Sequence, residues 1–448
     1  MHAISPDLAR QPEAVGTRGA PLEHAGGDAF NRHISVSRRP RRPAASAVTL
    51  LSWLIPLAFL AWAARLVFLE GYLYEIPGDF LGDFTRTAAL GAPTWWTGEG
   101  LFYGPIFVLE FKFLVEPQVL SNADFARLDF VLFGIAFVCV WLALVGRHRP
   151  RLALFVLAAW LANHMSVEAF ANTAHLEVLE LALIAVGLLL AVRGHAFAGG
   201  GALGLAIATK VLPGMFLPYL AITRQWRLLA GAIVFAGVPF LGVCWLQGIS
   251  PLEGLHALVY QGGNLTKLEY SEYEYTPRAE IARMLAGDGG TLSAQQAQLA
   301  IGLHWAIAIV TAVCVAWIVH RGRIGGSTYG LLFGLVAVVM LVAAPSAHPP
   351  YYIFLLLAWT AILAELLRRP FGVRTLGWWA ALLTAYTVTG FDQPFFLSQR
   401  LFGFGIVVPQ HWLAWHLPTL GLLLTLALLS ALLLTARPAV QRRHAGHA

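Results

Sequence analysis

The chain has 448 residues, of which 58% are hydrophobic and only 12% are charged, and its mean hydropathy is +0.67. A soluble domain is about 45–50% apolar and about 25% charged, so this composition requires a lipid bilayer that accepts apolar surface on every side. Soluble enzymes, nucleic-acid-binding proteins and disordered proteins are therefore excluded, and the formal net charge of +6 is read by position, because basic residues report orientation in membrane proteins.

Residues 1–45 are polar and rich in Pro, Gly and Arg, which predicts a disordered tail and not a signal peptide. The tail ends in a cluster of arginines directly before the first apolar run, and such clusters stay on the cytoplasmic side. We expect residues 46–437 to form a single integral membrane domain and residues 438–448 to form a second cytoplasmic tail. The arginines of the cluster are Arg38, Arg39, Arg41 and Arg42.

A series of apolar runs follows, each near the length of about 20 residues that a helix needs to cross a bilayer core about 30 Å thick. The first run covers about 47–69 and leads outward into a long polar segment, 70–123. The next three runs cover about 128–146, 152–165 and 178–192. Basic residues follow the second and fourth runs, so these two ends are expected in the cytoplasm.

Residues 196–222 are long enough to cross the membrane once, but basic residues flank them on both sides. Arg193 precedes the segment, and Arg224 and Arg227 follow it, so a single crossing would place one basic group outside and invert every later run. A break in the sequence KVLP at 210–213 resolves this conflict, because proline interrupts helical hydrogen bonding and irregular backbone is tolerated where it lines a protein cavity. The sequence therefore predicts a re-entrant hairpin or a pair of short, tilted helices.

The remaining runs then alternate in direction with their basic ends on one face. They cover about 228–247, 298–319, 327–344, 351–367, 375–391 and 412–436. The predicted fold is an all-α polytopic membrane protein with about ten full transmembrane helices plus the broken pair, and with both termini cytoplasmic. Its two large polar loops, 70–123 and 248–297, fall on the external face, which indicates a site there.

Two kinds of ionisable residue are candidates for chemistry. Asp79 and Asp83 follow the first run in the sequence GDFLGDF, and a carboxylate near an apolar wall can act as a general base, although a lone loop acid is more often only solvated. Lys210 is the only lysine within the apolar part of the chain after the first loop. A buried ammonium is costly unless it is paired, so Lys210 should face a cavity or an anion, or else snorkel at the end of a half-helix.

Several segments resemble glycosyltransferase family 87 of the GT-C superfamily, which includes bacterial α-mannosyltransferases. Arg86 with the alanines that follow it, and YGP at 103–105, are similar to the external loop of that family. The run GGALGLAIATKVLP at 200–213 is the most specific match, through its small residues and its Lys-x-x-Pro. GNLT at 263–266 and APSAH at 344–348 resemble the family's second-loop and histidine segments.

The resemblance implies a GT-C-type enzyme that transfers mannose, or another hexose or pentose, from a polyprenyl-phosphate donor to an external lipid or glycan acceptor. In such enzymes an external-loop Asp deprotonates the acceptor hydroxyl, and the sugar is transferred with inversion. Asp83 and Asp79 both remain candidates for this base, with a slight preference for Asp83. Lys210 and His348 match residues that would contact the donor phosphate, and Arg278 is a further candidate by its charge.

Aromatic and amide side chains of the two loops are candidates for sugar contacts. Tyr103, Asn264 and Tyr273 fit this role because tyrosine faces stack on sugar C–H surfaces, although a solvated loop would have the same composition. No metal or other cofactor is expected, because no Asp-x-Asp, His-x-x-x-His or cysteine pair occurs. The expected partners are the lipid-linked donor, a glycolipid or glycan acceptor and membrane lipids, with no nucleic acid.

A lipid-linked-sugar flippase or secondary transporter is the alternative, with the broken helix and Lys210 as a binding site without bond making. A transporter should carry ionisable residues on several spans, whereas here they gather on one face, which favours an enzyme. Three further histidines, His164, His175 and His304, have no matching motif and are interpreted as structural.

Overall fold

The computed structural model describes the apolar part of the chain and some of its connections. The chain divides into two units, Met1–Thr49 and Leu50–Ala448, and the second contains nearly all of the helical residues. No strand occurs among the described residues, which are helices and turns, so the prediction of an all-α polytopic membrane protein is confirmed. The described residues are 44–68, 104–115, 117, 119–163, 165–166, 169, 175–261, 268, 274–287, 291–322, 328–390 and 413–435.

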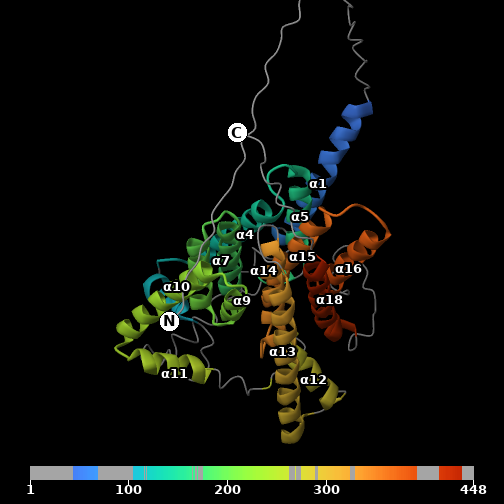
Figure 1. Ribbon diagram of the computed structural model, residues 1–448. Helices are drawn as coiled ribbons and strands as arrows, with labels where there is room; N and C mark the ends of the chain where they lie inside the picture. Colours follow the sequence, from blue (N-terminus) through green and yellow to red (C-terminus); the bar gives the residue numbers. More distant parts are fainter. Residues whose placement is uncertain are drawn as a thin grey trace, which may run out of the picture. The chain divides into compact units, whose positions relative to one another are not determined.

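Helices occupy the predicted apolar runs, with ends that differ by a few residues (Figure 1). The elements are α1 (Ala44–Phe68), α3 (Pro105–Glu110), η2 (Phe111–Val115), α4 (Asn122–Leu144), α5 (Pro150–Ala162), α7 (His175–Val192), α8 (Ala196–Thr209), η3 (Leu212–Met215), α9 (Phe216–Ile222), α10 (Trp226–Gln247), α11 (Pro251–Gln261), α12 (Pro277–Ala286), α13 (Ala294–Arg321), α14 (Tyr329–Ala343), η6 (Pro349–Ile353), α15 (Phe354–Leu366), α16 (Val373–Gly390) and α18 (Leu413–Thr435).

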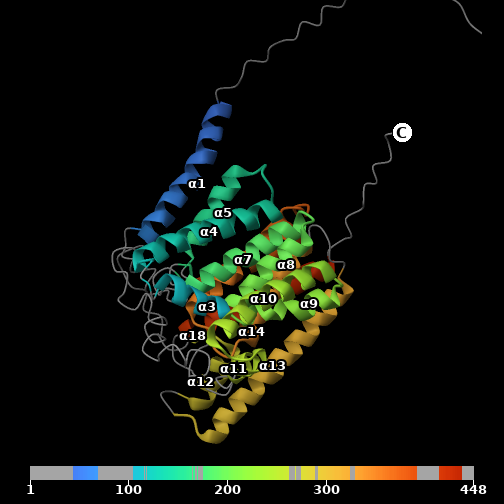
Figure 2. The same cartoon turned by 90° about the vertical axis from the view of Figure 1, so that its left-hand side faces the viewer.

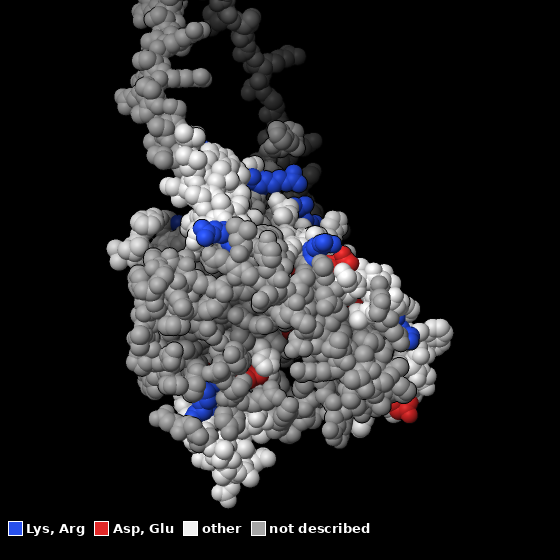
Figure 3. Space-filling view, turned by 180° about the vertical axis from the view of Figure 1, so that it is seen from behind, with Lys and Arg blue, Asp and Glu red and all other residues white. Residues whose placement is uncertain are grey.

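Five helices in the described part of the chain are long and apolar enough to cross a membrane, and several shorter apolar helices accompany them. α10 and α13 expose large apolar side chains such as Val238 and Val313, as expected of surfaces that face lipid. Among the residues that Figure 3 colours, charged side chains are few. The five helices support a polytopic arrangement, and the number of about ten spans stays a prediction.

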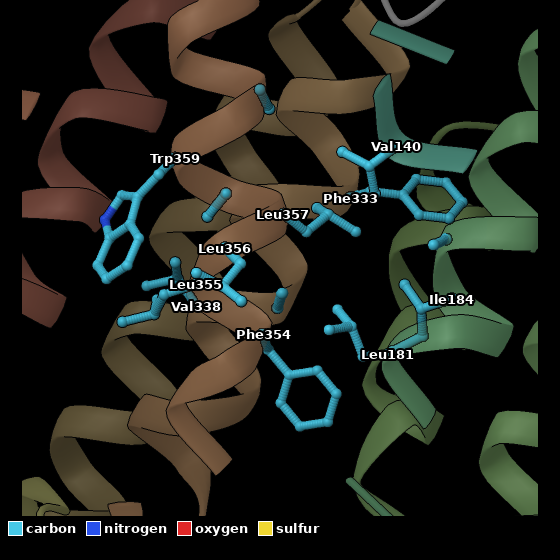
Figure 4. Packing of buried hydrophobic residues seen from close by; sticks show 14 of the residues in the cluster. Val140, Leu181, Ile184, Phe333, Val338, Phe354, Leu355, Leu356, Leu357 and Trp359 are labelled. Carbon is cyan, nitrogen blue, oxygen red and sulfur yellow. The ribbon is translucent and has the colours of Figure 1, made fainter. Parts of the chain in front are cut away.

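α14 and α15 form the centre of the hydrophobic core. Every residue of α14 from Gly330 to Val342 is buried, the pattern of a helix surrounded by other helices on all sides. The leucines of α15 belong to one cluster with residues of α4, α7 and α14, and Figure 4 shows Phe333 of α14 beside Val140 of α4. This core holds in place the helix ends that carry the buried polar residues.

α8 and α10 pack in direct backbone contact and lie side by side (Figure 2). Glycines allow this contact: a Cβ added at Gly200 would lie 1.9 Å from the carbonyl oxygen of Leu228, and one at Gly204 would lie 2.4 Å from that of Ala232. Positions later in α8 thus face positions later in α10, so the two helices are parallel. The chain between them must return to the end at which α8 begins.

The path of the chain from the end of α8 back to the start of α10 confirms the predicted broken pair. α8 ends at Thr209, and Lys210 is extended, with φ −143° and ψ 145°. The short elements η3 and α9 then carry the chain back to the start of α10, with Pro213 in the first turn of η3. A single straight crossing would have made α8 and α10 antiparallel, so the arrangement places Arg193 and Arg227 at the same end of the bundle, as the charge pattern requires.

Gly200→Ala is expected to lower the free energy of unfolding by about 1–3 kcal/mol, because the added methyl group forces two packed backbones apart. Gly237→Ala in α10 is the matched control, since a Cβ there meets nothing within 4 Å and alanine favours the helix. Unfolding of both variants in detergent measures the difference. Equal stability of the Gly200 variant and the wild type would contradict the close packing.

Candidate functional site

The break after α8 is covered by the start of α3. The backbone N–H of Gly104 donates to the carbonyl of Thr209 at 2.8 Å, and a Cβ at Gly104 would lie 2.2 Å from the carbonyl oxygen of Ala208. Only glycine fits this approach. The Tyr-Gly-Pro segment of the first loop and the Lys-x-x-Pro segment are thus in contact, although they are far apart in the sequence.

Lys210, directly after the break, is only 4% exposed. Its Nζ donates to a carboxylate oxygen of Glu177, which lies in the first turn of α7 and is also buried. The same Nζ lies 4.1 Å from the ring centroid of Tyr351 in η6, within the range of a cation–π interaction. The ammonium group of Lys210 is therefore buried, as predicted, and it contacts both a carboxylate and an aromatic ring.

Glu180 lies one turn further along α7 and is 0% exposed. Neither of its carboxylate oxygens has a hydrogen-bond partner among the described residues. Since Lys210 can neutralise only one of Glu177 and Glu180, this part of the site holds more acid than base. A buried acid without a partner destabilises a membrane protein, and such groups usually serve a function.

His175, at the start of α7, lies between two further acids. Its Nδ1 is 2.5 Å from Asp129 of α4, and its Nε2 is 3.4 Å from Glu110 of α3. A neutral imidazole has one N–H, so hydrogen bonds to both carboxylates require either the imidazolium or a protonated acid. His175 stands two residues before Glu177 on α7, and the interpretation of His175 as structural stays a prediction.

A second polar cluster joins the second polar loop, 248–297, to the segment 346–352. Glu274 is fully buried, and its carboxylate accepts hydrogen bonds from the Ser346 hydroxyl at 2.6 Å and the Ala347 N–H at 3.0 Å. The Tyr352 hydroxyl donates to the carbonyl of Tyr275 at 2.5 Å. Glu274 and Tyr275 therefore hold the segment from Ser346 to Tyr352 in place.

Tyr351 connects the two clusters. The side chain of His348 is 48% exposed, its Nε2 lies 3.3 Å from Glu274, and its ring centroid lies 6.5 Å from that of Tyr351. Tyr351 in turn contacts Lys210. An exposed imidazole and a buried ammonium, two groups able to bind an anion, are thus positioned by one aromatic ring.

Arg278 lies in the first turn of α12 and is 0% exposed. α12 begins at a cap made by Thr276, whose hydroxyl accepts from the backbone of Ala279 at 3.1 Å. Arg283 of the same helix pairs with Glu280 at 2.8 Å and donates to the carbonyl of Glu274 at 2.9 Å. Arg283 thus ties α12, the helix that carries the buried side chain of Arg278, to Glu274.

The structure brings Lys210 and His348 to the same tyrosine and places Arg278 in the neighbouring α12. The remaining candidates for catalysis and sugar contact lie outside the described residues, and their roles stay predictions. These are Asp79, Asp83, Tyr103, Asn264 and Tyr273.

Sequence reasoning missed the acids inside the helices. Glu177, Glu180 and Asp129 stand in or beside apolar runs, where an ionisable residue is itself a sign of function. The charge pattern drew attention to the external loops, and these three were passed over. The role of Tyr351 had no comparable signal, because an aromatic residue at the end of a span more often anchors the helix in the interface.

Comparison with known families gives one match: the model of glycosyltransferase family 87 covers residues 101–345, more than half of the chain. The matched region contains α3, the broken pair and α12, and ends just before His348. No curated protein matches the chain, and no solved structure matches it.

Proposed function

The chain belongs to glycosyltransferase family 87, and we propose that it transfers mannose, or another hexose or pentose, from a polyprenyl phosphate to a lipid or glycan acceptor. It is an α-helical membrane glycosyltransferase, which implies a sugar donor and an acceptor as substrates. The proposed location is the plasma (inner) membrane, with both termini in the cytoplasm and the active site on the external face. The proposed reaction uses no metal or other cofactor.

The convergence of three sequence segments on Lys210 supports this function best. The break at Lys210 lies against Gly104 of the first loop and against Tyr351, which follows the segment held by Glu274 of the second loop. The cluster is built from the ends of apolar helices, where a donor with a lipid carrier has direct access from the bilayer. A nucleotide sugar has no such carrier.

In the proposed reaction the acceptor hydroxyl oxygen attacks the anomeric carbon of the sugar. The bond from this carbon to the phosphate oxygen breaks, the new glycosidic bond forms with inversion, and Asp83 or Asp79 takes the proton of the hydroxyl. The departing phosphate is a stable anion, so its release needs cations more than an acid. Lys210, His348 and Arg278 are proposed to stabilise the developing charge.

The ion pair with Glu177 is compatible with this role of Lys210. An ammonium group has three N–H donors, so it can serve a carboxylate and a phosphate oxygen together. Glu177 and Tyr351 would fix the position of the ammonium before the donor arrives, which reduces the entropy lost on binding. The site would then be preorganised around the place where charge develops.

Asp83→Asn and Asp79→Asn test the proposed base. The variant that removes the base should reduce transfer by about 10²–10⁴-fold, because asparagine cannot accept the proton. Transfer from labelled polyprenyl-phosphate mannose is measured after reconstitution into liposomes, with the corresponding nucleotide sugar as an alternative donor. Asp124→Asn is the control, since Asp124 is an exposed capping residue of α4.

Wild-type turnover in both Asp variants would show that neither residue is the base. Transfer from the nucleotide sugar, together with none from the polyprenyl phosphate, would contradict the proposed donor. Movement of the intact lipid-linked sugar across the bilayer without any transfer would instead support the transporter alternative.

A further inference from the structure

The turn between α9 and α10 contains an unusual backbone conformation. Arg224 has a φ of +57° and is the only non-glycine residue with positive φ in the described part of the chain. This left-handed conformation is unfavourable for a residue with a side chain, whereas glycine adopts it freely. A side chain at a position that favours glycine indicates a function for that side chain. The other positive-φ residues are Gly146, Gly194, Gly248 and Gly287.

The Arg224 side chain is not needed to cap α9, because the backbone of the turn and the Thr223 hydroxyl satisfy the last carbonyls of that helix. The N–H and the hydroxyl of Thr223 both donate to the carbonyl of Tyr219, at 3.0 and 2.8 Å, and the N–H of Arg224 donates to Ala221 at 3.0 Å. The guanidinium of Arg224 is exposed and makes no ion pair with any other described residue. Its positive charge is therefore available to a ligand.

An open pocket of about 340 Å³ lies beside this side chain, between the end of α9 and the end of α13. Two of its lining residues are basic, and none is acidic. The last turn of α13 is closed by a hydrogen bond from the Gly322 N–H to the Ile318 carbonyl at 2.7 Å. The pocket is lined by Ile222, Thr223, Arg224, Val319, His320 and Gly322.

The pocket lies at the opposite end of the bundle from Lys210, because α8 and α10 both begin at this end and α8 ends at the break. Exposed tryptophans flank it: Trp226 is 61% exposed and Trp317 is 50% exposed. Tryptophan at helix ends marks the boundary between the hydrocarbon core and the headgroups. Further along α13, Val310 and Val313 present an apolar face suited to acyl chains.

We propose that this pocket binds the phosphate of an anionic lipid headgroup. Arg224 would bind the phosphate through paired N–H groups, and His320 would bind it from the α13 side. Basic pockets between membrane helices commonly take such headgroups. A lipid, and not free phosphate, is favoured because the apolar face of α13 adjoins the pocket and holds the chains of the same molecule.

Arg224→Gly tests the proposal without threatening the fold, because glycine relieves the strained conformation. The variant in detergent is titrated with phosphatidylglycerol or with phosphatidylcholine, and bound lipid is counted by native mass spectrometry. We expect retention of phosphatidylglycerol to fall about fivefold or more, with an unchanged or higher unfolding temperature. Arg127→Gln, at an exposed position at the start of α4, is the control and should leave retention unchanged.

Two further measurements complete the test. Arg224→Lys keeps the charge but loses the paired N–H groups of the guanidinium. Its retention of phosphatidylglycerol should therefore lie between that of the wild type and that of the glycine variant. Inorganic phosphate should compete only weakly with phosphatidylglycerol. Unchanged lipid retention in Arg224→Gly, or displacement of the lipid by inorganic phosphate at matched concentration, would overturn the proposal.

Discussion

Replacing Lys210 with methionine is expected to lower the free energy of unfolding by about 3–5 kcal/mol, because it leaves the buried carboxylate of Glu177 without its partner. Adding Glu177→Gln should restore most of this loss, since the second change removes the unpaired charge. If Lys210 binds the donor phosphate, the double variant should still fail to transfer sugar. Unfolding in detergent and the liposome transfer assay measure the two effects separately.

The double variant decides between a structural and a functional role for this lysine. A folded double variant with wild-type transfer would show that Lys210 only balances Glu177. Lys112→Met is the control for the loss of a lysine, because Lys112 is exposed in η2. It should leave the stability nearly unchanged.

Glu180→Leu is expected to raise the free energy of unfolding by about 1–3 kcal/mol, because the wild-type acid is fully buried and none of the described residues pairs with it. Transfer should fall in the same variant, as is usual when a destabilising group has been retained for function. Unfolding and transfer are measured on the same preparation. A stability gain accompanied by a loss of activity would assign Glu180 to the site.

Glu180→Gln separates the charge of this residue from its shape. Glutamine has nearly the same volume as glutamate but no charge. If transfer depends on the charge of Glu180, the glutamine variant should lose transfer to the same extent as the leucine variant. A leucine variant that is less stable than the wild type and fully active would mean that Glu180 supports the packing of α7 instead.

The membrane helices and their broken pair could be predicted from the sequence, because both follow from local composition. Apolar runs of sufficient length predict helices, and the arginines at 193 and 224 could not both be cytoplasmic if residues 196–222 crossed once. The parallel packing of α8 and α10 has the geometry that this argument demands. Lys210 was also recognisable, since a lysine among apolar residues is rare and costly.

The partners of these residues could not be predicted, because they depend on how distant helices pack. Glu177 and Lys210 are 33 residues apart, and Glu274 and Ser346 are 72 residues apart. Nothing in the sequence near one residue of either pair identifies the other residue as its partner. The three-helix contact of His175 with two acids likewise requires the positions of α3, α4 and α7 in space.

The structure of the protein with a bound polyprenyl phosphate tests the proposed donor site most directly. We predict phosphate density in contact with the ammonium of Lys210, near His348, with the lipid tail leading from the broken pair into the bilayer. Phosphate bound elsewhere, with Lys210 still held between Glu177 and Tyr351 as it is now, would contradict the proposed site.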